Sequence, residues 1–326
     1  MTSFPSRIQF EPAVVHLRSC DTDEVNHLLC TSHWQPKLVQ LEPGFVQHQY
    51  LVAQLGGIQF ARVTVNLGML HRSGSPHRTL TFALPLNPEP DYTWCGYSLS
   101  PQQIIVHHAN REVNLVGKNS SDFAVITLDV DDFLSSGMPD DQALFERVLS
   151  EQTHLLSVDQ MAFLRLKYYL QELLAMAQSQ PQKATHPVMQ TIIRNDFLPL
   201  LLECLGNSQS LSEAGSWNRY RLVKEVEAYM LTHLDRPLTL QDLCAAVGRK
   251  SRTLQFAFSA VYGISPMTYL KLQRLHGVRY QLQTANPKTK TVVGIATNWG
   301  FWHMGHFSRD YQRMFGETPS QTLKRA

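Results

Sequence analysis

The sequence has few cysteines and no long apolar run. Its five cysteines are irregularly spaced and include no Cys-x-x-Cys pair, which argues against a disulfide framework or a four-cysteine zinc site and is typical of a reducing compartment. No apolar run approaches the ~18 residues that a membrane helix needs. The amino terminus lacks the charged-then-apolar pattern of a signal peptide. We therefore expect a cytoplasmic protein that does not insert into a membrane.

The sequence also lacks the local signatures of several enzyme classes. It contains neither a glycine-rich phosphate-binding loop nor a nucleophile elbow. Five histidines are candidate metal ligands: His48, His71, His77, His107 and His108. The last two are adjacent, so in a strand they would point to opposite faces and could not both line one site. Cys95 is expected to be an ordinary buried or loop thiol. We therefore predict a protein that is not an enzyme and needs no metal or cofactor.

Charge is low overall but unevenly distributed. The 326 residues are 43% hydrophobic and 10% aromatic, enough for two or three folded domains. From Ser216 onward there are 16 Lys/Arg and 6 Asp/Glu, whereas the residues before it hold 13 and 21. The net charge of +2 therefore hides a basic carboxy-terminal third on an acidic body. A positive field of this kind attracts phosphate backbones, although a solvated basic face is the alternative.

Residues 35–135 are predicted to be mainly β. Apolar residues alternate in 59–67, where Ala61, Val63, Val65 and Leu67 share a face, and in 123–130, where Ala124, Ile126, Leu128 and Val130 do. Residues 80–86 and 103–107 are short apolar runs between turn residues. This pattern predicts a small antiparallel barrel or sandwich. Six aromatic residues could line a ligand pocket or simply fill the core: Trp34, Tyr50, Phe60, Tyr92, Trp94 and Tyr97.

Helices are predicted to follow the β region. They span 140–152, 161–178 and 187–204, and a capping box of Ser157 and Gln160 would begin the second. An apolar face on that helix is expected to include Leu164, Tyr168 or Tyr169, Leu173 and Met176. Residues 206–216 are small, polar and aperiodic, which is typical of a linker.

The most informative feature is a pattern that occurs twice in the basic third. The first copy runs from Leu243 to Gly248 and from Leu254 to Pro266. The second copy, 52 or 53 residues later, runs from Ile295 to Gly300 and from Phe307 to Pro319. Each copy predicts a short helix, a glycine turn, and a second helix with an apolar stripe. A helical bundle would explain the stripes but not the repeated glycine turn and Gly-x-x-Pro stop. We therefore predict two helix-turn-helix motifs, at about 240–262 and 292–315.

The residues from about 222 to 326 resemble the double helix-turn-helix domain of the AraC/XylS transcription regulators. The resemblance rests on 240–248, 252–255, 262–266, Arg274-Leu275, 278–282, Ile295-Ala296, Gly300-Phe301, 307–309 and 315–319. Residues 299–307 are similar to those of the ethanolamine-utilisation regulators in that family. The amino-terminal region is more weakly similar to the cupin-like sensing domains of such regulators.

The resemblance and the patterns together predict a multi-domain α+β protein. Residues 1–138 would form a cupin-like antiparallel β-barrel, and 139–206 helices that pair two subunits or cover the barrel. A linker at 207–217 would lead to an all-α double helix-turn-helix domain at 218–326. The resemblance further implies an effector-responsive activator of transcription. Its partners would be double-stranded DNA, RNA polymerase, a small-molecule effector whose site the sequence does not identify, and a second subunit.

Particular side chains are expected to read DNA. Arg252, Thr253, Gln255 and Phe256 lie on or near the outer face of the first recognition helix, and the resemblance assigns Met304, His306, Ser308 and Arg309 to the second. Arginine can pair twice with guanine, glutamine can pair twice with adenine, and apolar groups pack on the thymine methyl. Two other functions stay open, a nonspecific architectural DNA binder and an enzyme of cupin type with a DNA-recruiting tail.

The second recognition helix departs from the family pattern at its start. Trp302 and His303 stand where small polar capping residues are usual, and Gly305 lies in the first turn. A missing cap and an internal glycine each cost about 1 kcal/mol. Either packing by Phe301 and Trp302 holds this helix, or it orders fully only on DNA.

Overall fold

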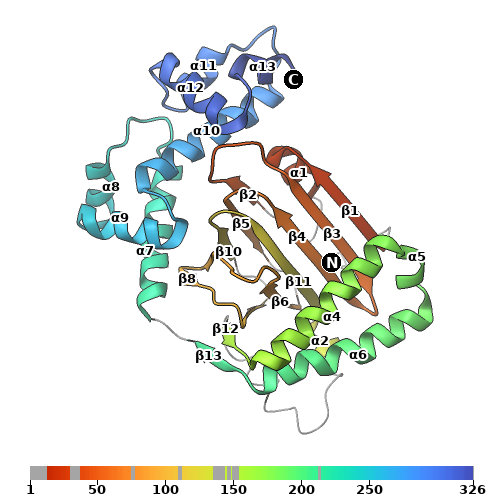
Figure 1. Cartoon of the computed structure of the whole chain (residues 1–326). Coiled ribbons are helices and arrows are strands. Elements are labelled where there is room, and N and C mark those ends of the chain that lie inside the picture. Colours follow the sequence, from red (N-terminus) through yellow and green to blue (C-terminus); the bar gives the residue numbers. More distant parts are fainter. Residues whose placement is uncertain are drawn as a thin grey trace, which may run out of the picture.

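The protein consists of a β-rich part followed by an all-helical part (Figure 1). The structure, a computed structural model, describes residues 13–29, 37–74, 78–108, 112–134, 154–211 and 214–325, together with Leu144 and Val148. We call residues 13–211 the β-domain and residues 214–325 the helical domain. This division into antiparallel sheets and carboxy-terminal helices confirms the predicted α+β class at that level.

Two antiparallel sheets make up the β-domain. The eight-stranded sheet has the order β1 (Val14–Ser19), β3 (His48–Leu55), β4 (Ile58–Val65), β11 (Ser121–Asp129), β6 (Thr79–Pro85), β9 (Gln103–His108), β12 (His154–Ser157) and β13 (Gln209–Leu211). The five-stranded sheet has the order β2 (Lys37–Gln40), β5 (Met69–Gly74), β10 (Glu112–Gly117), β7 (Tyr92–Trp94) and β8 (Tyr97–Ser98). Over the part of the chain that the structure describes, no strand pair joins the two sheets. The fold is thus two facing layers, and a closed cupin-like barrel is not confirmed.

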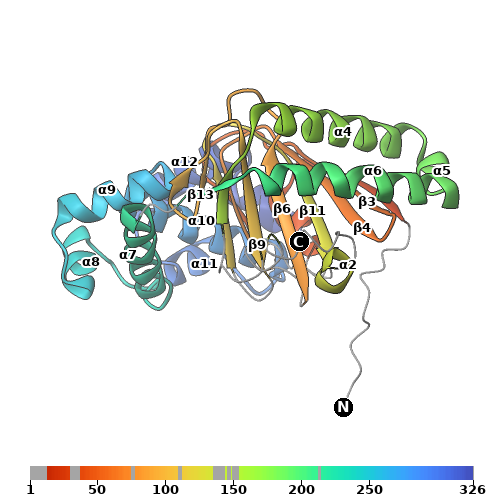
Figure 2. The same cartoon turned by 90° about the horizontal axis from the view of Figure 1, so that it is seen from below.

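The predicted alternation is correct, and it divides two hydrophobic clusters. Ala61 and Val63 face the space between the sheets, whereas Ala124, Ile126 and Leu128 lie on the opposite face of the eight-stranded sheet. That outer face is covered by α4 (Gln160–Ser179) and α6 (Pro187–Gly206), which lie across it in Figure 2. The eight-stranded sheet is therefore buried on both faces.

The helices of the β-domain differ from the sequence-based expectation in two details. Besides α4 and α6 they are α1 (Thr22–Leu29), α2 (Val130–Leu134) and α5 (Pro181–Ala184). The predicted capping box at Ser157 is wrong, because Ser157 belongs to β12 and the Asp159 side chain caps α4 instead, accepting from the backbone of Met161 and Ala162. The inner face of α4 includes Leu173, with Tyr169 and Met176 packed against the core, as predicted, whereas Leu164 and Tyr168 are exposed.

The predicted linker at 207–217 contains regular structure. Gln209–Leu211 forms β13 and pairs with β12, and α7 (Ala214–Leu231) already begins within the segment. Since the edge of the sheet holds this segment, the chain enters the helical domain from a fixed strand rather than from a free tether. The predicted helix at 140–152 lies outside the described residues, apart from Leu144 and Val148, which are helical.

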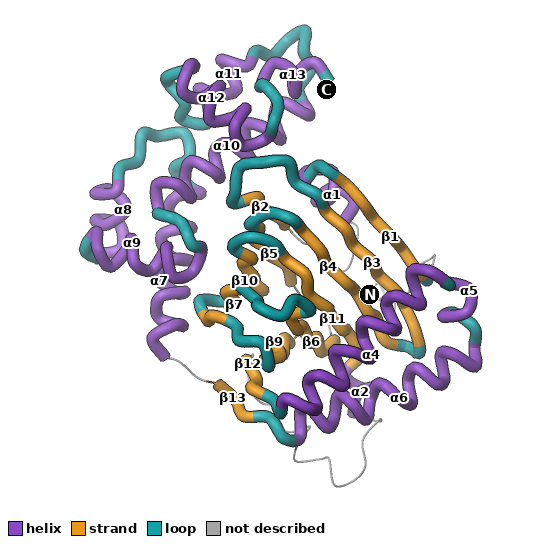
Figure 3. Tube along the Cα trace, viewed as in Figure 1, coloured by secondary structure: helices purple, strands orange, loops and turns teal. Residues whose placement is uncertain are grey.

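The helical domain contains the predicted repeat. After α7, the first motif consists of α8 (Leu240–Val247) and α9 (Ser251–Tyr262), and the second of α11 (Val292–Asn298) and α12 (Met304–Phe315). Helix α10 (Pro266–Thr284) bridges the motifs and α13 (Pro319–Lys324) ends the domain (Figure 3). Gly248 and Gly300 in the turns have φ of 61° and 76°, a left-handed conformation that favours glycine.

Each recognition helix is anchored by the stripe that the repeat predicted. Leu254, Phe258, Val261 and Tyr262 of α9 are fully buried, and so are Phe307, Tyr311 and Met314 of α12. The periodicity of 3.6 residues per turn places all of these side chains on one side. Both motifs therefore keep their other face toward solvent.

Gly277 allows α10 to approach the second motif closely. A Cβ built on Gly277 would overlap the six-membered ring of Trp299, and no real carbon contact is that short. On the same helix, Arg274 donates to the backbone carbonyls of Leu234 and Arg236. Helix α10 is thus tied to the chain before the first motif and to the turn of the second.

We expect Gly277→Ala to destabilise the full-length chain in urea unfolding. Alanine gains about 1 kcal/mol of helix propensity over glycine, but the clash with a bulky, immobile indole costs about 1–3 kcal/mol. Gly305→Ala is the matched control, because a Cβ at Gly305 in α12 meets nothing within 4 Å. It should stabilise the chain. Equal stabilisation by both substitutions would contradict the packing of Trp299 on Gly277.

Candidate nucleic-acid interface

Helix α9 presents the predicted side chains of the first motif to solvent. Arg252, Thr253, Gln255 and Phe256 are all exposed, and Phe256 is 62% exposed despite its apolar ring. Arg249 and Lys250 are exposed at the same end of the helix. Helix N-termini and basic side chains both attract phosphate groups. The first turn of α9 therefore combines phosphate-binding and base-reading chemistry.

Helix α12 presents a similar but less complete face. His306, Ser308 and Arg309 are exposed, whereas Met304 is half-buried and packs against the core. Of the four side chains predicted to read DNA from α12, Met304 is therefore the one that is not exposed.

The start of α12 is weakly capped, as the sequence predicted. Its N-cap residue, His303, makes no side-chain capping hydrogen bond. The ring of Phe301 packs against Phe307 with centroids 4.9 Å apart, while Trp302 is 60% exposed. Packing by Phe301, without Trp302, therefore supports the first turn.

One side chain beside the first motif was missed from the sequence. Arg219 of α7 places its guanidinium 5.7 Å from the ring centroid of Phe256 and donates to the Ser216 hydroxyl at 2.7 Å. A cation over an aromatic face is favourable and restrains both groups. No sequence signal identifies this pair, because the residues are far apart in the chain and belong to different helices.

A second candidate site lies between the two sheets of the β-domain. A cavity of about 160 Å³ is lined by residues of both sheets: Leu29, Leu38, Tyr50, Val52, Gln59, Ala61, Val63, His71, Ser73, Thr81, Ala83, Ile105, His107, Leu115, Phe123 and Val125. Of the six aromatic residues considered for a pocket, Tyr50 lines this space. Phe60, Tyr92 and Trp94 are buried elsewhere in the core, Tyr97 is half-buried against it, and Trp34 lies outside the described residues.

Burial holds two polar groups of this cavity, His71 and Tyr50, in their neutral forms. Burial lowers the pKa of His71 to about 3 and raises the pKa of Tyr50 well above its usual value. The Tyr50 hydroxyl and the His71 Nε2 atom have no hydrogen-bond partner within the described residues. Buried polar atoms normally have a partner, so these two could receive one from a bound molecule.

The predicted metal ligands do not assemble into a site. His107 faces the cavity together with His71, but within the described ranges no group of three or more His, Cys, Asp or Glu side chains is placed to hold a metal ion. His77 lies outside the described residues. The helices that the structure describes include none long and apolar enough to cross a membrane.

The sequence of the helical domain has known relatives. Residues 243–325 match the protein family described as a helix-turn-helix domain. The probable thc operon regulatory protein of Rhodococcus erythropolis is 36% identical over 103 residues, which are 32% of this chain and 31% of that protein. XylDLEGF operon transcriptional activator 1 of Pseudomonas putida is 32% identical over 127 residues, or 38% of this chain and 37% of that protein. The chain thus spans about a third of the length of these curated relatives.

A solved structure matches the same part of the chain. It is a probable AraC family transcriptional regulator from Rhodopseudomonas palustris, 41% identical, and the match covers 32% of this chain and 97% of that one with a TM-score of 0.30. Residues 243–325, which match the family, contain both glycine turns, the bridging helix α10 and the second motif, and begin within α8 of the first motif. The carboxy-terminal third of this chain is a helix-turn-helix DNA-binding domain of the AraC family.

Proposed function

We propose that the chain is a sequence-specific transcription regulator that binds double-stranded DNA and responds to an effector, as an activator. The observation that carries this proposal is that one basic domain exposes two recognition helices at once, each anchored by its own buried stripe. Two such helices, tied together by α10, can enter successive segments of the major groove. An architectural binder would not need the polar and aromatic base-reading set on α9.

We assign the direct base contacts mainly to the first motif. Arg252, Gln255 and Phe256 carry the side chains that distinguish bases, with Thr253 beside them. In the second motif His306, Ser308 and Arg309 are fully accessible, and Met304 would contribute only in part because it also packs inward. Since Gly305 offers no side chain, the second motif would rely more on phosphate contacts and DNA shape.

Arg252→Ala should weaken binding to the cognate duplex by about 1–3 kcal/mol and relax specificity at one base position. The duplex can be obtained by selection from random sequences, and binding measured by titration at fixed salt. Arg252→Lys should keep phosphate attraction but lose the paired hydrogen bonds, and Lys183→Ala on exposed α5 is the neutral control. Equal weakening by Arg252→Ala on cognate and random DNA would favour the architectural alternative.

We further propose that the cavity of the β-domain is the effector site. A cavity of about 160 Å³ resembles in size the ~150 Å³ cavities that accept benzene. Among the described lining residues there is no Asp, Glu, Lys or Arg, so an ionised ligand would be buried without a counter-charge. The effector class that fits is a small, mainly apolar, uncharged molecule with one group that hydrogen-bonds to Tyr50 or His71.

Benzyl alcohol is a suitable probe of this chemistry. It should raise the midpoint of thermal unfolding of the full-length chain, because a ligand that binds only the folded state stabilises it. Benzoate, of the same size but charged, should not. Ala61→Leu, which fills the cavity, should abolish the shift. If the midpoint still rose in Ala61→Leu, or rose equally with benzoate, the cavity would not be the effector site.

We propose a second copy of the chain as the partner of an exposed apolar stripe on the helices of the β-domain. The side chains are Met161, Leu164 and Tyr168, which form a stripe on α4, with Val188 and Ile192 on α6, all exposed. Helices that merely covered the sheet would need only one apolar face, and α4 has two. A self-complementary patch is what a two-fold dimer requires.

Leu164→Glu combined with Tyr168→Glu should convert a dimer into a monomer in sedimentation velocity experiments, because two buried charges are costly. Tyr280→Glu, at a similarly exposed aromatic of α10, should leave the dimer intact. A wild type that stays monomeric at every soluble concentration would refute the pairing.

Several narrower expectations remain predictions. Contact with RNA polymerase follows from the activator role, and the similarity of residues 299–307 to ethanolamine-utilisation regulators bears on ancestry rather than on the ligand. A cupin-like origin of the two sheets and the domain boundaries expected from the sequence also remain predictions. The enzyme alternative is not favoured, because the relatives named above are regulators of transcription. Metal bound to the purified protein would favour that last alternative.

A further inference from the structure

The first motif is attached to the β-domain by a buried charge cluster. Arg72 of β5 donates to the Glu227 carboxylate of α7 at 2.5 Å, and Tyr262 and Tyr269 donate to the same carboxylate. Lys224 bonds Glu227 at 2.9 Å and Glu112 at 3.0 Å. Glu227 is 2% exposed and Arg72 is 13% exposed. We call these five residues, with Glu112, the Arg72 clamp.

The Arg72 clamp and the cavity occupy opposite faces of one sheet. His71 and Ser73 line the cavity, while Arg72 between them points to the helical domain, as alternation in a strand requires. On neighbouring β10, Leu115 lines the cavity and Asn114 bonds both Arg72 and the Tyr220 hydroxyl of α7. A single layer of backbone therefore separates the cavity from the first motif.

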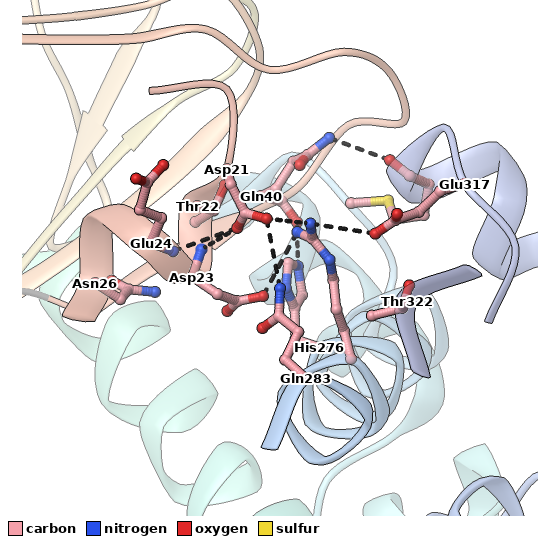
Figure 4. A network of polar contacts seen from close by, with 12 residues as sticks. Asp21, Thr22, Asp23, Glu24, Asn26, Gln40, His276, Gln283, Glu317 and Thr322 are labelled. Carbon is pink, nitrogen blue, oxygen red and sulfur yellow. Dashed lines mark hydrogen bonds and ion pairs between the residues drawn. The ribbon is translucent and has the colours of Figure 1, made fainter. Parts of the chain in front are cut away.

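The second motif has a separate attachment, shown in Figure 4. Arg279 of α10 is 7% exposed and reaches three carboxylates: Asp21 at 2.6 Å, Asp23 at 3.5 Å and Glu317 at 3.6 Å. Asp21 and Asp23 belong to the start of α1 in the β-domain, and Glu317 follows α12. The guanidinium also lies 4.7 Å from the ring centroid of Phe315, the last residue of α12.

Backbone contacts extend this attachment to the recognition helix itself. The Gln40 side-chain amide and the Gly44 backbone N–H both donate to the Met314 carbonyl at 3.3 Å. That carbonyl lies in the last turn of α12, where helices leave carbonyls without intrahelical partners. His276 of α10 donates to the Gln40 carbonyl at 2.9 Å and packs edge-on against Phe315. We call Asp21, Asp23, Arg279, Glu317 and Gln40 the Arg279 clamp.

The Arg279 clamp supports α12 at the end opposite to its weak first turn. Its N-terminal turn has no side-chain cap and contains Gly305, so little local structure fixes it. The β-domain holds the opposite end, through a buried arginine and two donors to one carbonyl. Helix α9, by contrast, receives its support near Tyr262, from the Arg72 clamp.

We propose that the β-domain positions the two recognition helices independently, α9 through the Arg72 clamp and α12 through the Arg279 clamp. Gln40 and Arg279 are positioning residues for DNA reading by the second motif, although neither faces DNA. The proposal rests on the proposed function, since it assumes that both motifs read DNA. Because His71 and Ser73, on either side of Arg72, line the cavity, an effector there would act directly on the strand that carries the Arg72 clamp and so on α9.

The test uses the full-length chain and two sets of variants. Gln40→Leu and Asp21→Asn each weaken the Arg279 clamp, the second mildly because an amide can still accept a hydrogen bond. Arg72→Met and Glu112→Gln weaken the Arg72 clamp in the same graded way. Hydrogen exchange of backbone amides is measured without DNA in residues 304–315 and 251–262. Hydroxyl-radical footprints on a selected duplex then report how far each motif protects its DNA segment. Loss of protection in Arg252→Ala identifies the segment bound by α9, and loss in Arg309→Ala identifies the segment bound by α12.

Gln40→Leu and Asp21→Asn should speed exchange in 304–315 and lower occupancy of the α12 segment on the order of fivefold to tenfold, leaving 251–262 and its segment unchanged. Arg72→Met and Glu112→Gln should instead speed exchange in 251–262 and lower occupancy of the α9 segment, leaving 304–315 and its segment unchanged. If the variants of one clamp changed both motifs equally, or changed neither, the proposal that the clamps act independently would be overturned. This holds even if the wild type gives a normal footprint. Wild-type protein with no protected segment would overturn the proposed function instead, while the exchange pattern would still decide whether the clamps act separately.

Discussion

The arrangement of the whole molecule depends on the buried carboxylate of Glu227. A charge with 2% exposure is tolerated only if it is paired and hydrogen-bonded, and removing one partner of such a pair typically costs about 3–5 kcal/mol. Here the partners come from both domains: Arg72 from the five-stranded sheet, and Lys224, Tyr262 and Tyr269 from the helical domain. Burial opposes the charged form of Arg72, but the nearby Glu227 carboxylate outweighs it and raises the pKa of Arg72. The helical domain can therefore dock on this sheet in few other orientations.

The contact between the helical domain and the β-domain leaves the side chains that we propose read DNA exposed. The side chains that face the β-domain come from α7, α10 and the carboxy-terminal ends of α9 and α12, whereas Arg252, Gln255 and Arg309 stay exposed. A single hydrophobic cluster runs from the space between the sheets into the helical domain. The chain thus combines an accessible face, which we propose binds DNA, with a continuous hydrophobic connection to the space between the sheets.

Patterns that depend on neighbours in the chain predicted structure well. The stripes of α9 and α12, the left-handed Gly248 and the weak start of α12 followed from local spacing and capping chemistry. The alternation of 59–67 and 123–130 was also correct. The prediction failed where a distant segment pairs with the one considered: Ser157 belongs to β12, and residues 209–211 form a strand at the edge of the sheet. Pairing across the fold overrides local preference in each case.

The sequence by itself determined the two motifs, because a helix is specified by contacts three and four residues apart and the repeat shows the same spacing twice. It also determined the basic charge of the last third. Only the tertiary structure decided that Arg72 and Arg279 join the domains, that Arg219 lies over Phe256, and that a neutral cavity forms behind β5. These features bring together residues as far as 258 positions apart, as between Asp21 and Arg279. Such proximity is set by how the sheets and helices pack, which no local pattern encodes.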